Sequence, residues 1–231
     1  MNHFSYFLID ILTVLFPIVW SFEKKMNFVQ KWRFLIPGLI ATAIFFLIWD
    51  GVFTYLGVWG FNPDYNLGIN IINLPLEEVL FFICMPFASM FVYETVYFLW
   101  KGRIRAGILH QISIVITFFC LLFGMYHYDK WYTCVAFVGS GLLLGYHCSM
   151  KNSLDHEKFW VSYLIILIPF TLVNGILTGA ITSEPIVWYN NTENLGIRFI
   201  TIPIEDFAYN MLLLLMNVTF YEAGLKRLKV N

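Results

Sequence analysis

Seven apolar stretches recur along the chain, and most match the length of about 20 residues that a helix needs to cross a bilayer. Of the 231 residues, 59% are hydrophobic and only 13% are charged, about half the charged share of a soluble domain. The expected fold class is therefore all-α, a polytopic membrane protein with about seven transmembrane helices. These helices are expected at residues 4–22, 34–49, 75–100, 107–126, 131–148, 159–181 and 202–224.

The positive charges between these stretches predict how the chain is oriented. Lys and Arg mark cytoplasmic loops, and here they follow the first, third, fifth and seventh stretches. Residues 50–74 contain none, and the other two loops contain only Lys130 and Arg198. The N-terminus is therefore expected outside and the C-terminus in the cytoplasm, across a bacterial cytoplasmic membrane. The clustered charges are Lys24, Lys25, Lys31, Arg33, Lys101, Arg103, Arg105, Lys151, Lys158, Lys226, Arg227 and Lys229.

The chain also repeats itself. Residues 67–94 and 195–222 share eight identities in 28 positions at a fixed offset of 128, among them Leu-Gly-Ile and a closing Tyr-Glu pair. After a four-residue gap, Asp50-Gly51 matches Asn174-Gly175. Matching segments four helices apart run in the same direction through the membrane. The sequence thus predicts two parallel three-helix repeats, 1–105 and 129–231, joined by a linker helix at 106–128.

Paired acids open one helix in each repeat, in Pro75-Leu76-Glu77-Glu78 and Pro203-Ile204-Glu205-Asp206. Proline and acids suit the first turn of any helix, so a single copy would indicate only a helix start. Two copies at equivalent positions, at the edge of the hydrocarbon, favour function because ionisable groups near lipid are costly. We therefore predict that Glu77, Glu78, Glu205 and Asp206 form an acid–base set.

A crowded, partly dry group of acids can hold one carboxyl protonated while another stays ionised, so it needs no cofactor to move protons. Asp50 and Asn174 lie on the same side of the membrane, where they either contact substrate or support the acids. Asn210 replaces Phe82 in the second repeat and is a third candidate for substrate contact. Because the halves differ at these positions, we expect one site with two different walls.

Other residues are expected to be structural. Glu94 and Glu222 lie about 25 Å further along their helices, where they anchor the helix ends or pair with basic loops. Gly139, Gly141 and Gly145 fit close helix packing better than nucleotide binding. The histidines show no metal-ligand spacing, and the cysteines are typical of buried small hydrophobes, so no metal or cofactor site is predicted. These residues are His110, His127, His147, His156, Cys84, Cys120, Cys134 and Cys148.

The duplicated PxE(E/D) motif at the head of a transmembrane helix, in a chain of this length, resembles the small membrane-integral lycopene cyclases. That family occurs as two short subunits or as one fused chain, and the likeness covers residues 34–100 and 159–224. It implies redox-neutral cyclisation of the acyclic ends of lycopene, or a related linear carotenoid, to β-type rings, yielding γ- or β-carotene through a carbocation. It also implies the bilayer as substrate source, contact with other carotenoid-pathway membrane enzymes, no cofactor and no nucleic acid.

Two alternatives stay open at this point. A small transporter or channel with duplicated acidic gates would also place carboxylates in parallel repeats, although the helix interiors carry few polar residues to line a water-filled path. A carotenoid-binding membrane protein without activity would share the apolar pocket. A retinal-binding protein is disfavoured, because residues 202–224 contain no lysine for a Schiff base.

Overall fold

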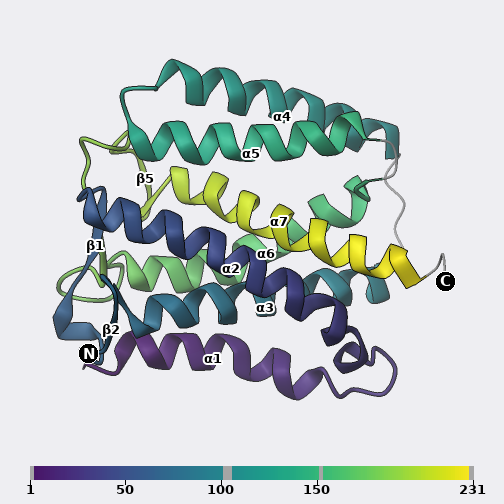
Figure 1. Ribbon diagram of the computed structural model, residues 1–231, viewed down its shortest axis with the longest axis horizontal. Coiled ribbons are helices and arrows are strands. Elements are labelled where there is room, and N and C mark those ends of the chain that lie inside the picture. Colours follow the sequence, from purple (N-terminus) through teal and green to yellow (C-terminus); the bar gives the residue numbers. More distant parts are fainter. Residues whose placement is uncertain (1–2, 101–105, 151–152, 229–231) are drawn as a thin grey trace.

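The computed structural model describes residues 3–100, 106–150 and 153–228. Lys101, Arg103, Arg105, Lys151 and Lys229, on which the orientation argument partly depends, lie outside the described residues, as does the side chain of Arg227. Seven α-helices fill most of the described chain (Figure 1). They are α1 (Ser5–Trp20), α2 (Trp32–Tyr55), α3 (Leu76–Leu99), α4 (Ala106–Tyr126), α5 (Trp131–Ser149), α6 (His156–Leu177) and α7 (Glu205–Leu228).

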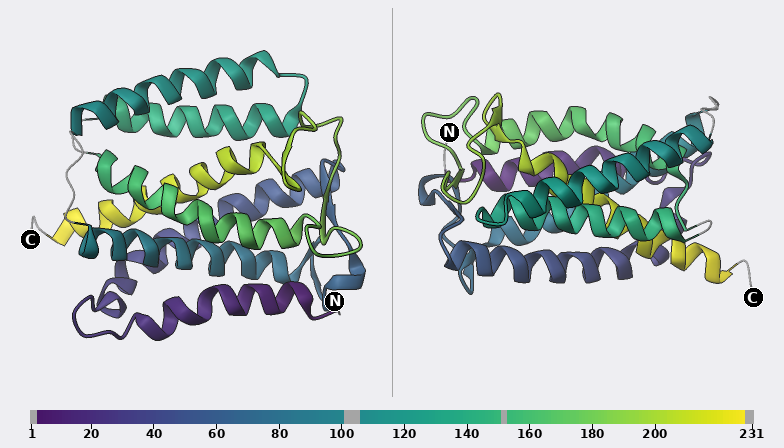
Figure 2. Two further views of the ribbon diagram at one scale, coloured as in Figure 1. Left: turned by 180° about the vertical axis from the view of Figure 1, so that it is seen from behind. Right: turned by 90° about the horizontal axis from the view of Figure 1, so that it is seen from above.

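The helices lie side by side in one bundle, and the two halves of the chain interlock (Figures 1 and 2). Within each half, α1 packs on α3 and α5 packs on α7. Across the halves, α2 packs on α7 and α3 packs on α6. The α4 helix covers α5 at the edge of the bundle. A site between α3 and α7 is therefore built from both halves.

The outer surface of the bundle is apolar, as a lipid-facing surface should be. Four helical segments of the described chain are long and apolar enough to cross a membrane: Phe28–Tyr55, Leu76–Val96, Gly107–Tyr126 and His156–Leu177. Leu12, Phe118 and Leu172 are each more than 60% exposed, and large exposed apolar patches mark interaction with membranes or partners. The all-α fold with seven helices is confirmed, while seven full membrane crossings stay a prediction.

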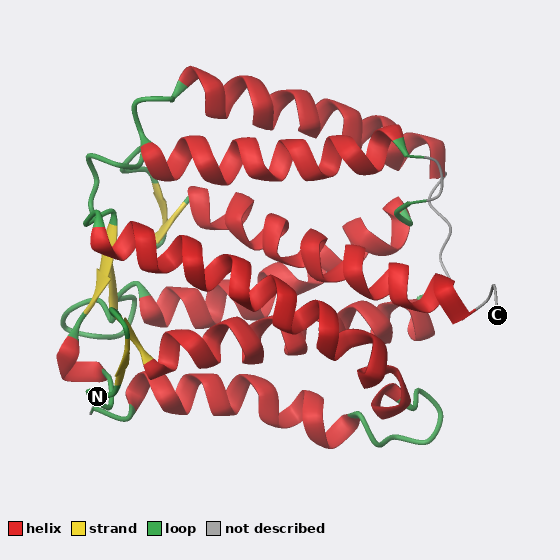
Figure 3. Cartoon of the chain, in the orientation of Figure 1, coloured by secondary structure: helices red, strands yellow, loops and turns green. Residues whose placement is uncertain are grey.

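Short strands at one end of the bundle were not predicted from the sequence (Figure 3). The first, β1 (Trp59–Phe61), pairs antiparallel with β4 (Val187–Tyr189) and so joins the two halves. Two small hairpins, β2–β3 (Asn70–Ile71 with Leu74–Pro75) and β5–β6 (Arg198–Phe199 with Ile202–Pro203), precede α3 and α7. Ile72 and Ile200, 128 positions apart, both adopt positive φ near 60°, so the repeated sequence folds into a repeated turn. Two 3-10 turns, η1 (Phe28–Lys31) and η2 (Pro63–Tyr65), complete the described elements.

The glycines of α5 serve packing, as predicted. A Cβ on Gly141 would lie 2.9 Å from Leu121 Cγ on α4, and one on Gly145 would lie 3.0 Å from Thr117 Cγ2. A Cβ on Gly139 would lie 3.0 Å from Leu212 Cδ2 on α7. The small residues therefore let α4 and α7 approach opposite sides of α5.

Ion pairs hold together the end of the bundle opposite the strands. Glu94 contacts Lys31 and, at 2.8 Å, Lys158. Glu222 lies 3.5 Å from Lys158 and accepts a hydrogen bond from the Tyr93 hydroxyl. The prediction that Glu94 and Glu222 pair with basic residues at their helix ends is confirmed.

Candidate active site

A cavity opens at the strand end of the bundle, between the two halves of the chain. Aromatic and aliphatic side chains make up most of its walls, and three carboxyl groups, three amides and a serine hydroxyl lie among them. The apolar walls include Trp59, Phe81, Phe82, Met85, Tyr209 and Leu213.

One acid from each motif lines this cavity. Glu78, in the first turn of α3, accepts a hydrogen bond from the Tyr6 hydroxyl of α1. Asp206, in the first turn of α7, accepts one from the Tyr132 hydroxyl of α5. Both carboxyls are buried, and the hydrogen-bonding tyrosine comes from the first helix of the same half. The structure therefore brings the second acid of each motif into one shared site.

The first acid of each motif points to its own loop. Glu77 Oε1 accepts the backbone N–H of Leu67 at 2.6 Å, and Glu205 Oε1 accepts that of Leu195 at 2.9 Å. Neither residue lines the cavity, and both are fully buried. These bonds fix the hairpin before each helix, and with it the direction in which the helix and its second acid enter the site.

The hydrogen bonds around the two cavity-lining acids differ. Asp206 Oδ2 accepts the Asn174 amide at 2.6 Å and the Tyr189 hydroxyl at 3.1 Å, besides the bond from Tyr132 to Oδ1. Glu78 has only the bond from Tyr6 among the described residues. Asp206 is thus held by three donors from three elements, and Glu78 by one.

All three predicted substrate-contact residues line the cavity. Asp50 Oδ1 accepts the Trp59 indole N–H at 2.5 Å, so this carboxyl positions an aromatic wall. Asn174 lies against Asp206 and supports it. Asn210 presents an amide nitrogen for which the described residues offer no hydrogen-bond partner, which leaves it available to the cavity.

Sequence reasoning missed the aromatic donors of this site. Tyr6, Tyr132 and Tyr189 are three of 13 tyrosines, and Tyr6 and Tyr132 reach their acids across 72 and 74 positions. Burial, and next the Asp206 carboxylate, raise the pKa of Tyr189 well above its usual value, so this residue remains a hydrogen-bond donor. No spacing rule in the sequence links residues so far apart.

Asp10 was also missed, although its signal was present: a single acid inside an apolar stretch is a functional candidate by default. It is fully buried on α1, one turn after Tyr6, and neither carboxyl oxygen has a hydrogen-bond partner in the described chain. It lies close enough to Glu78 to interact with it electrostatically. The residue four positions after Tyr132 is Ala136, also fully buried, so only the first half carries this extra acid.

The fold and site define a polytopic membrane protein with a largely apolar, aromatic-lined cavity that holds the second acid of each motif together with Asp50. The family model for lycopene cyclase matches residues 3–96 and 129–223. The chain therefore belongs to the lycopene cyclase family, as the motif resemblance implied, and this membership supports carotenoid cyclase activity on a linear carotenoid in a lipid setting. Searches of curated proteins and of solved structures find no match to the chain.

Proposed function

We propose that this chain converts the acyclic ends of lycopene to β-type rings by acid–base catalysis without a change of oxidation state. The observation that carries the proposal is that the second acids of the two motifs, Glu78 and Asp206, line one largely apolar cavity and have different hydrogen-bond partners. One carboxyl adds a proton to the terminal double bond, and the resulting carbocation is attacked by the neighbouring double bond to close a six-membered ring. The other carboxyl removes a ring proton, so one proton enters and one leaves for each ring formed.

Glu78 is the acid in this proposal, and Asp206 is the base. Hydrogen bonds donated to a carboxylate favour its charged form, whereas burial and neighbouring acids favour the neutral form. Asp206 accepts three such bonds, which suits a base that begins the reaction ionised. Glu78 accepts one and lies near Asp10, which suits an acid that begins the reaction protonated.

The cavity walls supply what a carbocation needs. Trp59, Phe82 and Tyr209 line the cavity together with the acids, and the faces of aromatic rings stabilise cations. Aromatic and aliphatic side chains form most of the walls, and exclusion of water by such walls favours ring closure over capture of the cation by water. Glu77 and Glu205 complete the catalytic set as positioning residues, because their bonds fix the hairpins from which Glu78 and Asp206 project.

The same reasoning extends to architecture and orientation. The two family-matched segments, separated by α4, and the matching bonds of Glu77 and Glu205 support two parallel repeats, 1–105 and 129–231, around a linker at 106–128. Seven membrane crossings follow from this arrangement. Lys31 and Lys158 lie at the ion-paired end, which supports a cytoplasmic location for that end and an outer location for the cavity. Contact with other carotenoid-pathway membrane enzymes is expected, because substrate and product both stay in the bilayer.

The test is to express the chain in a bacterium engineered to accumulate lycopene and to separate the pigments by chromatography. We expect lycopene to be replaced by carotenes with one or two β-type rings. Glu78→Gln, present in the membrane at the same level, should leave lycopene unchanged. Unaltered lycopene with the unmodified chain present in the membrane would refute the proposal and would favour a carrier or a non-catalytic carotenoid-binding protein.

A further inference from the structure

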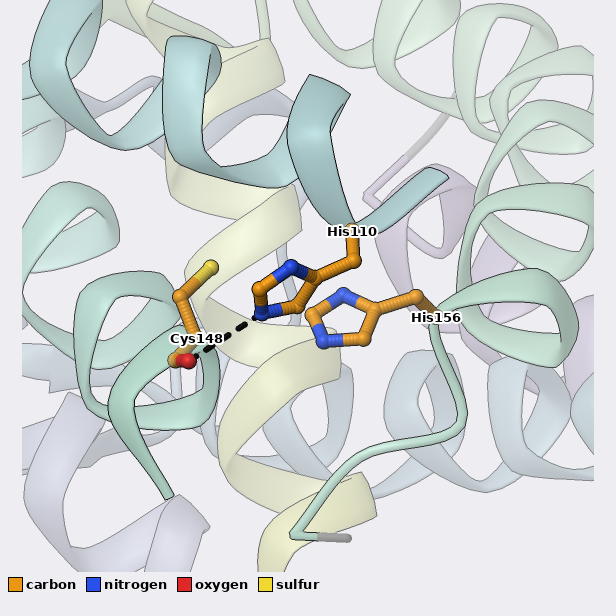
Figure 4. A group of neighbouring side chains, drawn as sticks. All are labelled: His110, Cys148 and His156. Carbon is orange, nitrogen blue, oxygen red and sulfur yellow. Dashed lines mark hydrogen bonds between the residues drawn. The ribbon is translucent and has the colours of Figure 1, made fainter. Parts of the chain in front are cut away.

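Three metal-binding side chains from three helices meet at the end of the bundle opposite the active-site cavity (Figure 4). They are His110 in α4, Cys148 in α5 and His156 at the start of α6. One ligand atom from each lies within 4.8 Å of the other two. Their sequence spacing matches no metal motif, because the three helices bring them together only in the folded chain.

Hydrogen bonds fix the protonation of both imidazoles. His110 Nε2 lies 3.1 Å from the Cys148 carbonyl oxygen. Because a carbonyl can only accept, this nitrogen carries the proton. The other nitrogen of His110, Nδ1, is then left with a free lone pair. A ring nitrogen in that state is the form that binds metal ions.

His156 is fixed in the complementary way. Its Nδ1 lies 2.8 Å from Ser113 Oγ, whose own proton is donated to the Leu109 carbonyl at 2.9 Å. Ser113 Oγ also accepts the Trp160 indole N–H at 2.8 Å. The Ser113 oxygen therefore accepts from His156, Nδ1 carries the proton, and Nε2 is left with a lone pair. Such outer hydrogen bonds are what orient the histidine ligands of metal sites.

We propose that His110, Cys148 and His156 bind a zinc ion that fastens α4 to α5 and α6. Imidazole and thiolate groups are both zinc ligands, and three protein ligands leave the fourth tetrahedral position to water, as in open zinc sites. Zinc bond lengths place tetrahedral ligand atoms roughly 3.3–3.6 Å apart, closer than the 4.8 Å limit within which these atoms lie, so side-chain rotations that bring the atoms together complete the site. All three residues are partly exposed, which leaves a route for the ion.

The site has a structural purpose that the fold makes clear. The α4 helix lies at the edge of the bundle and contacts mainly α5 and α6. A metal ion bound by all three helices cross-links this edge helix to the second half of the chain. The cavity lies at the other end of the bundle, so zinc binding and cyclisation are separable.

The experiment uses the full chain, purified in detergent without a histidine tag and analysed for zinc by elemental mass spectrometry. We expect close to one zinc per chain, removed by a chelator and restored by added zinc together with a higher unfolding temperature. Cobalt substituted for zinc should give a thiolate-to-cobalt absorption band. Cys148→Ser should lose that band and most of the zinc, whereas Cys134→Ser, which alters a partly buried cysteine nearer the other end of α5, should retain both.

A second variant guards against a trivial loss of folding. Ser113→Ala leaves all three ligands in place but removes the acceptor that fixes His156, so zinc affinity should fall by about 10–100-fold. The proposal is overturned if the purified chain neither retains nor rebinds zinc. It is equally overturned if Cys134→Ser or His127→Ala reduces zinc as much as Cys148→Ser does.

Discussion

Replacing Glu78 by glutamine tests the role of the acid with little disturbance to the structure. The Tyr6 hydroxyl donates to Glu78 Oε2, and a glutamine carbonyl oxygen can accept the same bond. The variant therefore keeps the contact between α1 and α3 but has no acidic proton to deliver. Loss of a general acid lowers a rate by about 10²–10⁴-fold, or about 2.7–5.5 kcal/mol in activation free energy. Cyclisation should fall by that factor, with no loss of protein from the membrane.

Glu77→Gln is the matched control, one position away in the same motif. Its carbonyl oxygen can still accept the Leu67 N–H that Glu77 Oε1 now binds at 2.6 Å. We expect this variant to keep most of its activity, whereas Glu77→Ala should lose activity together with the hairpin. The assay measures cyclised carotene per unit of membrane protein, by chromatography and immunoblot. Full activity in Glu78→Gln combined with none in Glu77→Gln would refute the division of roles between the two acids.

Three further perturbations test the acid, the ion pairs and the packing. Asp10→Asn should slow cyclisation while the protein still accumulates, because the side chain stays polar but the acid near Glu78 is lost. Activity equal to that of the parent would show that Asp10 has no part in the reaction. Lys158→Met should destabilise the fold and lower its unfolding temperature in detergent, because it removes a cation that Glu94 and Glu222 share and leaves Glu94 paired with Lys31 alone among the described residues. An unchanged unfolding temperature would contradict this. Gly141→Ala should cost about 1–3 kcal/mol by overpacking α4 against α5, measured in the same unfolding assay, and a stabilised variant would show that the helices can separate freely.

The helices could be predicted because each is one continuous apolar stretch, but some of their ends could not. The second helix was expected to end at residue 49, yet α2 continues through Asp50 to Tyr55. That acid is tolerated because Trp59, nine positions later, donates to it. The seventh was expected to begin at residue 202, where residues 202–203 instead form β6. Both departures arise from loop contacts that periodicity does not encode.

The candidate site was only partly predictable, for a related reason. The motif identified the four acids, but sequence alone could not separate the two that face the cavity from the two that bind their loops. Adjacent acids point about 100° apart on a helix, and only the neighbouring helices decide which direction leads into the cavity. The group of His110, Cys148 and His156 was missed because spacing along the chain was the only criterion applied.

Duplication and divergence together account for the two opposite chemical roles that we propose for Glu78 and Asp206. The matching bonds of Glu77 and Glu205, and of Tyr6 and Tyr132 to their acids, place Glu78 and Asp206 in equivalent frames. Two identical carboxyls in such frames would have the same proton affinity, and neither would be suited to give a proton that the other takes. Asn174 and Tyr189 add hydrogen-bond donors to Asp206. Asp10 adds an acid near Glu78, whereas the equivalent position in the second half is Ala136. The shared frame keeps both groups around one cavity, and in the proposed mechanism these few differences separate the proton donor from the proton acceptor.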